Sequence, residues 1–251
     1  MSNNLLARPS VGSWITIAHP TIAEIMAASG FDWLAVDLEH SAITIREAEE
    51  LIRIIELNQV VPFVRLTSSN PDQIKRVMDS GAHGVIVPMV NDKRVAELAV
   101  AATKYPPIGN RSYGLARAQK YGHGFEEYVS WQASNAMVVV QIEHIDAVNN
   151  LEEILLVDGV DAYFVGPYDL SGSLGIPGQF SHPDFVSAME RIKSVAEAVG
   201  KPGGVHIIEP DGEMLRDALA QGYQFVAYSL DFKILDSGSR AGLKAWRKIC
   251  D

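Results

Sequence analysis

Eight short apolar segments lie along the whole chain, and amphipathic stretches separate most of them. The segments are near-continuous runs of Val, Ile, Ala and Phe, which is typical of parallel strands that are covered on both faces. The predicted strands are residues 13–18, 33–39, 62–66, 84–90, 137–143, 161–165, 203–208 and 225–230. Eight strand–helix units in 251 residues match the size of a closed barrel. We therefore predict a single (β/α)8 TIM-barrel domain that spans residues 1–251.

The predicted helices support this alternation. Helical periodicity covers residues 45–57, 71–80, 92–104, 183–199 and 211–221. Asn70-Pro71 and His182-Pro183 place a proline at the first helical position, where its missing N–H costs nothing. A doubly wound open sheet is the main alternative, but no Gly-x-Gly-x-x-Gly follows the first strand, so a Rossmann nucleotide site has no support. The long connection over residues 104–131 is rich in Gly, Pro and aromatic residues, and we expect it to be functional.

Composition argues against several kinds of partner. A formal net charge of −10 disfavours a nucleic-acid surface, because phosphate binding needs clustered Lys and Arg. No apolar run approaches the ~20 residues that span a bilayer, and residues 1–4 do not begin a basic and apolar leader. The single cysteine, Cys250, cannot form an internal disulfide, which fits a reducing compartment. We expect a cytoplasmic protein that binds neither nucleic acid nor membrane.

Two carboxylates follow neighbouring predicted strands. Glu143 ends the fifth strand, and Asp169 opens the turn after the sixth. The carboxyl ends of barrel strands meet at one rim, and two hard oxygen ligands there suit a divalent cation with open positions for substrate. Either residue alone could instead cap the following helix. The pair, with Gln141 beside Glu143, favours a metal site, and strand alternation turns His144 away from it.

Other polar residues end predicted strands at the same rim. His40 follows the second strand with Asp37 nearby, and a histidine partnered by a carboxylate is the natural general base near neutral pH. A hydrogen-bonded surface histidine is the alternative, and we expect it for the other six histidines, including His206. Arg65 ends the apolar third strand, where a fixed guanidinium suits a carboxylate or a developing oxyanion. A structural salt bridge from Arg65 to Asp37 or Glu39 is the rival explanation.

The chain resembles the HpcH/HpaI aldolase family, the class II pyruvate aldolases, over nearly its whole length. The residues that carry the resemblance are 31–33, 37–40, 64–65, 84–90, 105–111, 141–143, 159–161 and 166–171, which include Asp37-Leu38-Glu39-His40, Gln141-Ile142-Glu143 and Gly166-Pro167-Tyr168-Asp169. The resemblance implies a pyruvate-type (β/α)8 barrel, assembled as a hexamer in which neighbouring subunits exchange the last helix.

The same resemblance implies a ligand set for metal and pyruvate. Glu143 and Asp169 bind the divalent cation, typically Mg²⁺, Mn²⁺ or Co²⁺. Gln141 and the backbone of Tyr168 and Asp169 contact the pyruvate portion of the substrate. The chain departs from the family at Tyr168, where a small residue is common, and at Tyr113, in the turn after the Pro-Pro pair. Bulk at these two positions is expected to narrow the aldehyde pocket.

Catalytic roles also follow from the resemblance. Arg65 stabilises the enolate oxygen. His40 is the base, and Asp79, which is not next to it in sequence, is the carboxylate that raises its basicity. Asp37, the partner suggested by local sequence, becomes the secondary candidate. Leu38 stands where the family often has Gly, but none of the metal or base positions is lost.

Together, the residues and the resemblance predict a carbon–carbon lyase. It would reversibly cleave a 4-hydroxy-2-oxo acid, or a 2-dehydro-3-deoxy sugar acid, to pyruvate and an aldehyde. Lysines are absent from the predicted strand interiors, which disfavours a Schiff-base mechanism. The alternatives are a lyase of the malyl-CoA or citryl-CoA kind, and an oxo-acid decarboxylase or enolate-trapping enzyme. The short chain without a basic patch disfavours the CoA-linked reaction, and a non-enzymatic binding protein has the least support.

Overall fold

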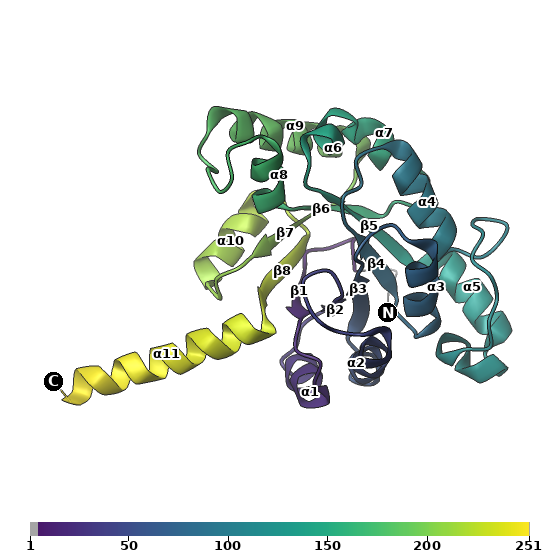
Figure 1. The fold of residues 1–251 in the computed structure, drawn as a ribbon, viewed down its shortest axis with the longest axis horizontal. Helices are drawn as coiled ribbons and strands as arrows, with labels where there is room; N and C mark the ends of the chain where they lie inside the picture. Colours follow the sequence, from purple (N-terminus) through teal and green to yellow (C-terminus); the bar gives the residue numbers. More distant parts are fainter. Residues whose placement is uncertain (1–4, 251) are drawn as a thin grey trace.

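The computed structural model describes residues 5–250. Residues 1–4, on which the leader argument depends, lie outside this part, as do Asp251 and the side chain of Cys250. Eight parallel strands close into a barrel in chain order, with helices around the outside (Figure 1). The predicted (β/α)8 barrel is therefore confirmed, and the open doubly wound sheet is excluded. No helix among the described residues is long and apolar enough to cross a membrane.

All eight predicted strands are present. The strands are β1 (Ser10–Ile15), β2 (Trp33–Asp37), β3 (Val61–Arg65), β4 (Gly84–Val87), β5 (Met137–Ile142), β6 (Ala162–Val165), β7 (Gly203–Ile207) and β8 (Phe225–Leu230). The helices are α1 (Pro20–Ala28), α2 (Ile45–Leu57), α3 (Pro71–Asp79), α4 (Lys93–Thr103), the 3-10 helix η2 (Arg117–Gly122), α5 (Phe125–Asn135), α6 (Ile145–Asn149), α7 (Leu151–Leu155), α8 (Pro167–Ser173), α9 (Pro183–Val199), α10 (Gly212–Ala220) and α11 (Asp231–Cys250).

The predicted bounds of β1, β2 and β4 were wrong by two or three residues, and the start of β1 and the end of β4 each have a physical cause. β1 begins at Ser10 rather than at residue 13, because Ser10 already pairs with Phe225 of β8 and its N–H donates to the Gln224 carbonyl at 2.8 Å. β4 ends at Val87 rather than at residue 90, because Met89 adopts a positive φ of 52° that a strand cannot continue through.

Large aromatic side chains fill the interior of the barrel below its carboxyl rim. The rings of Trp33 and Phe225 stack at 4.0 Å, and Trp14 meets Phe164 edge-on at 5.6 Å. Gly12 is required by this packing, because a Cβ there would lie 2.0 Å from the Trp33 ring. The interior is thus a packed core rather than a pore, and polar residues at the strand ends lie above it.

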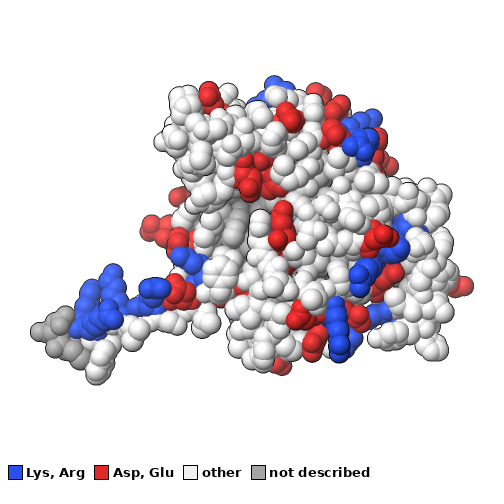
Figure 2. All heavy atoms as spheres, viewed as in Figure 1, with Lys and Arg blue, Asp and Glu red and all other residues white. Residues whose placement is uncertain are grey.

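The last helix, α11, extends away from the barrel (Figure 1). Its large apolar side chains are mostly exposed to solvent. Leu235 is 61% exposed, Leu243 58%, Trp246 61% and Ile249 78%. Figure 2 shows Lys and Arg side chains gathered at the outer end of this helix, while acidic side chains are spread over the barrel. An apolar stripe of this size on an isolated helix is typical of an interaction surface.

Candidate active site

A buried ion pair joins the carboxyl ends of β2 and β3. Asp37 and Arg65 are register partners, and Arg65 donates from Nε at 2.8 Å and from Nη2 at 2.7 Å to the two oxygens of Asp37. Arg65 Nε also lies 3.4 Å from Glu39 Oε2, and the guanidinium lies 4.4 Å from the Trp14 ring centroid. The rival salt bridge considered from the sequence is therefore present. It fixes the guanidinium at the rim rather than removing it from the site.

Glu143 is held in one orientation just beyond the end of β5. Its Oε1 accepts the Met89 N–H at 2.7 Å, and its Oε2 accepts the Gln141 side-chain amide at 2.8 Å. A Cβ on Gly166 would lie 2.6 Å from Glu143 Oε2, so the chain after β6 approaches this carboxylate as only glycine can. His144 instead caps α6, where its Nδ1 accepts the Asp146 N–H at 3.1 Å.

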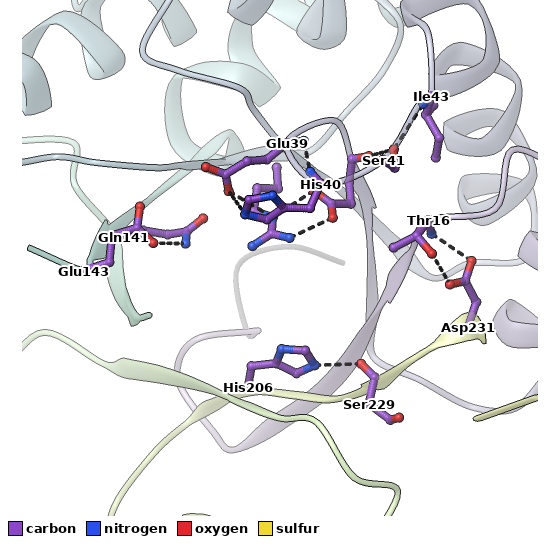
Figure 3. Close-up of polar contacts among 12 residues, drawn as sticks. Thr16, Glu39, His40, Ser41, Ile43, Gln141, Glu143, His206, Ser229 and Asp231 are labelled. Atoms are coloured by element: carbon purple, nitrogen blue, oxygen red, sulfur yellow. Dashed lines mark hydrogen bonds and ion pairs between the residues drawn. The ribbon is translucent and has the colours of Figure 1, made fainter. Parts of the chain in front are cut away.

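One open cavity of ≈ 780 Å³ lies at the carboxyl ends of the strands. Asp169, in the first turn of α8, lines it, as does Tyr168, whose ring meets Phe180 edge-on at 5.0 Å. The β5 and β6 strands are neighbours, as the sequence predicted for the two carboxylates that follow them. The predicted site residues that line this cavity are Asp37, His40, Arg65, Gln141, Glu143, Tyr168 and Asp169. Figure 3 shows several of them around the opening.

Three carboxylates influence one another at this rim. Burial raises the pKa of Glu143 to about 7, with the charges of Glu39 and Asp169 acting in the same direction and Arg65 opposing them. Burial likewise raises the pKa of Glu39 to about 7, with Arg65 again opposing and Asp169 reinforcing the shift. Burial is thus the main reason why both carboxyls resist ionisation, and the neighbouring carboxylates add to it.

The donor set at this rim fits a hard divalent cation. Glu39 Oε2 and Gln141 Oε1 are buried oxygens without a hydrogen-bond partner, beside carboxylates that burial has made reluctant to ionise. A divalent cation would bind to oxygens that lack a hydrogen-bond partner, and it would favour the ionised form of the two carboxyls. The described residues contain no group of three or more His, Cys, Asp or Glu placed to hold a metal. Water or substrate oxygens would therefore have to complete the coordination.

His40 follows β2, and its ring is 66% exposed. Ring Nε2 lies 3.8 Å from Glu39 Oε2. Asp37, the partner suggested by local sequence, binds Arg65 through both oxygens and accepts the backbone N–H of His40 at 3.3 Å. The structure thus places Asp37 under the backbone of the His40 turn and in the Arg65 pair, where its carboxylate fixes the turn.

Asp79 lies at the other end of the barrel. It is the last residue of α3, which runs back from the carboxyl end of β3 over nine residues, about 13 Å. There it lies 3.5 Å from Arg111, whose buried guanidinium lies 4.1 Å from the Tyr105 ring centroid and donates to Tyr128 at 2.9 Å. The long loop after α4 therefore anchors Asp79. Within one chain the structure does not bring Asp79 to His40.

Comparison with known proteins assigns the chain to a family. The profile of the HpcH/HpaI aldolase/citrate lyase family matches residues 10–237. The chain belongs to the HpcH/HpaI family. It is 36% identical over 239 residues to the 4-hydroxy-2-oxovalerate aldolase of Novosphingobium aromaticivorans, which covers 95% of this chain and 90% of the relative. The resemblance drawn from the sequence is confirmed.

Two further comparisons agree with this assignment. The chain is 38% identical over 229 residues to the 2-keto-3-deoxy-L-rhamnonate aldolase of Klebsiella pneumoniae, covering 90% of this chain and 85% of the relative. The crystal structure of an HpcH/HpaI aldolase/citrate lyase family protein from Burkholderia cenocepacia J2315 matches with a TM-score of 0.91 at 30% identity, over 98% of each chain. The HpcH/HpaI relatives therefore share the whole barrel with this chain.

Sequence reasoning missed three residues that shape the site of this HpcH/HpaI protein. Glu39 was considered as a partner for Arg65 and as a neighbour of His40, but not as a carboxylate whose charge raises the pKa of Glu143. Trp14 and His206 line the cavity from β1 and β7. For His206 the available signal was its position in an otherwise apolar strand, where a polar side chain needs a reason to be buried.

Metal binding to this HpcH/HpaI protein should strengthen as pH rises toward about 7. Glu39 and Glu143 must lose their protons to face a cation, so affinity should rise up to about tenfold per pH unit for each proton displaced, and then level off. Calorimetric titration with Mn²⁺ in buffers of different ionisation enthalpy would measure both affinity and proton release. Glu152→Gln, exposed on α7, is the matched control. A pH-independent affinity without proton release would contradict this expectation.

The same shifts affect the stability of the metal-free protein. Between the ordinary glutamate pKa of 4.5 and about 7, the folded chain binds more protons at Glu39 and Glu143 than the unfolded chain does. Stability therefore falls as pH rises through this window. Bound cation should remove that loss, because it binds the ionised folded state.

Proposed function

We propose that this chain is a divalent-metal-dependent aldolase that reversibly cleaves a 4-hydroxy-2-oxo acid to pyruvate and an aldehyde. One observation carries the proposal: Glu143, Gln141 and Asp169 lie at the same cavity as a guanidinium that Asp37 holds fixed. Two relatives at 36% and 38% identity, named as aldolases for 4-hydroxy-2-oxovalerate and 2-keto-3-deoxy-L-rhamnonate, support the same reaction class.

In this mechanism Glu143 and Asp169 would hold the cation, with Gln141 and the backbone at Tyr168 and Asp169 against the pyruvate portion. When bound, Mg²⁺, Mn²⁺ or Co²⁺ supplies Lewis-acid polarisation of the 2-oxo group. The Gln141 amide donates to Glu143 and leaves its own oxygen free, so it orients the carboxylate while facing the cavity. The substrate is thereby held with its 2-oxo group toward the rim carboxylates.

Arg65 and His40 then act on opposite ends of the breaking bond. His40 takes the proton of the 4-hydroxyl, the C3–C4 bond breaks, and its electron pair stays on the pyruvate fragment as an enolate. The aldehyde leaves, and a proton added to C3 completes pyruvate. Arg65 faces the negative charge that develops on the enolate oxygen; because Asp37 has already fixed its orientation, little reorganisation is needed at the moment of reaction.

We also propose that the working form is an oligomer, of hexamer size by the family resemblance. Two observations support this. α11 presents an exposed apolar face that no other part of the described chain covers. Asp79 and His40 lie at opposite ends of the barrel, so Asp79 can serve as the partner of His40 only from a neighbouring subunit. A fully active monomer, established by light scattering, would overturn this proposal.

The proposed reaction is tested by pyruvate release from 4-hydroxy-2-oxo acids, first with metal-stripped protein and then with Mg²⁺, Mn²⁺ or Co²⁺ restored. We expect no cleavage without metal, recovery with at least one cation, and a loss of at least ~10²-fold in Glu143→Gln. Glu152→Gln keeps full activity as the matched control. Cleavage by the metal-stripped protein, or no cleavage with any cation, would contradict the proposal. In the second case, assays of CoA thioesters and oxaloacetate would be the next step.

A further inference from the structure

His206 places a hydrogen-bond acceptor in the cavity, on the wall opposite the rim carboxylates. Its ring Nε2 lies 3.1 Å from the Ser229 carbonyl oxygen. A carbonyl oxygen only accepts, so Nε2 must carry the proton, and in the neutral ring Nδ1 is left with a free lone pair. Burial lowers the pKa of His206 to about 4, and the Arg65 charge acts in the same direction, so the ring is neutral near pH 7.

The position of the ring shows where this acceptor points. His206 lines the same cavity as Arg65 and Glu143, and its ring meets Trp14 edge-on at 5.8 Å. Trp14 in turn carries the Arg65 guanidinium at 4.4 Å. Figure 3 shows the His206 ring pointing from its strand into the opening, with Glu39, His40 and Glu143 on the far side. The acceptor therefore lies across the cavity from the groups assigned to the pyruvate portion.

The pyruvate portion of the substrate cannot donate the hydrogen bond that His206 Nδ1 accepts. Its carboxylate and carbonyl oxygens accept hydrogen bonds and donate none, and the 4-hydroxyl proton is assigned to His40. A donor for His206 must therefore lie farther along the aldehyde fragment. The charged groups on this wall are Glu209 and Asp217, which repel an anion, and Gln221 and Tyr223 are its neutral polar groups. Among the described residues lining the cavity, the cation besides histidine is Arg65, which is paired with Asp37 and already assigned to the enolate oxygen.

We infer that His206 is a specificity-determining residue, which accepts a hydrogen bond from a hydroxyl on the aldehyde fragment, and that this fragment is an uncharged hydroxyaldehyde. The inference rests on the proposed aldolase function and narrows its substrate class. Apolar neighbours on the same wall, Met214 and Phe232, suit the carbon chain of such an aldehyde. A fragment with a second carboxylate would meet acidic groups without a free cation.

The test compares three matched substrates: 4-hydroxy-2-oxopentanoate, 4,5-dihydroxy-2-oxopentanoate and 4-hydroxy-2-oxoglutarate, whose terminal groups are methyl, hydroxymethyl and carboxylate. We expect kcat/KM to be highest for the dihydroxy acid, by about five- to tenfold over the methyl compound, as one neutral hydrogen bond supplies. The carboxylate compound should be the poorest. His206→Leu should bring the first two substrates to within about twofold of each other. His206→Asn, which keeps an acceptor oxygen, should retain part of the preference.

Two controls separate the possible failures. Deuterium exchange at the pyruvate methyl group reports enolate formation without any aldehyde, and it should be unchanged in His206→Leu. The Ser229 carbonyl keeps a second donor, Ser13 Oγ at 3.2 Å, which supports folding of that variant. His182→Asn, which replaces a histidine that caps α9 outside the cavity, should behave as the wild type.

Exchange with no preference for the hydroxylated substrate, or a preference for the carboxylate, overturns this inference alone. Equal loss of exchange and of all cleavage in His206→Leu overturns it as well, by making His206 part of the enolate machinery. Absence of both exchange and cleavage in the wild type overturns the proposed function and this inference together.

Discussion

Replacing Arg65 by alanine is expected to lower kcat for cleavage by about 10²–10³-fold, the usual cost of removing one preorganised donor to a developing oxyanion. Metal affinity should change by less than about tenfold. It should be measured over a range of pH, because Arg65 lowers the pKa of Glu143 and its removal raises that pKa further. Pyruvate release and Mn²⁺ titration on the same preparation give the two quantities.

The Arg65→Ala variant also leaves the Asp37 carboxylate, which is 1% exposed, without its bidentate partner. A loss of folding could therefore imitate a loss of catalysis. Arg65→Lys keeps the charge and removes the planar fork, so it should fold and still lose most of the activity. Arg53→Ala, which removes an exposed helix pair with Glu49 on α2, is the control for arginine loss. Unchanged turnover in a folded Arg65→Ala protein would contradict the assigned role.

Residues that follow strands could be placed from the sequence alone. Once eight parallel strands are recognised, the position of Glu143, Asp169 and Arg65 at one rim follows from the topology, because all carboxyl ends point the same way. The side chains that pair with those residues were less predictable. Both Asp37 and Glu39 are within reach of Arg65, and only the sheet register, which sets Asp37 directly opposite Arg65, decides that Asp37 forms the bidentate pair.

Groups that act through long-range packing could not be found this way. Nothing in the sequence around Gly166 indicates that a side chain there would collide with the Glu143 oxygen. The role of Met89 depends on one positive φ, which turns its N–H toward Glu143. His206 stands out in the sequence only as a polar residue in an apolar strand, and its proposed role depends on the Ser229 carbonyl that fixes its tautomer. These features arise from contacts between distant segments, so local pattern carries little information about them.

The family resemblance and the structure of the single chain disagree about the surroundings of Asp79. The resemblance pairs it with His40, whereas α3 carries it to the opposite end of the barrel, beside Arg111. The two statements are compatible if the barrel end of one subunit that carries Asp79 faces the His40 end of another. A paired site of this kind makes a sharp prediction, because each half of it can be removed in a different chain.

Mixing two inactive variants should restore activity. We expect His40→Ala and Asp79→Asn each to lose about 10²-fold or more in cleavage, because each removes the base or the group that supports it. When the two are co-expressed in equal amounts, an oligomer with random composition should contain intact sites at about a quarter of its interfaces. Activity of the purified mixture should then approach that fraction of the wild type, while each variant alone stays inactive.

A second mixture provides the control. His40 and Glu143 line the same cavity of one chain, so co-expression of His40→Ala with Glu143→Gln can rebuild no complete site. That mixture should stay as inactive as its components. Activity restored in the first mixture and absent in the second assigns Asp79 to the neighbouring subunit. No restoration in either mixture, from oligomers shown by mass to contain both chains, would remove Asp79 from the site and leave Glu39, at 3.8 Å, as the carboxylate partner of His40.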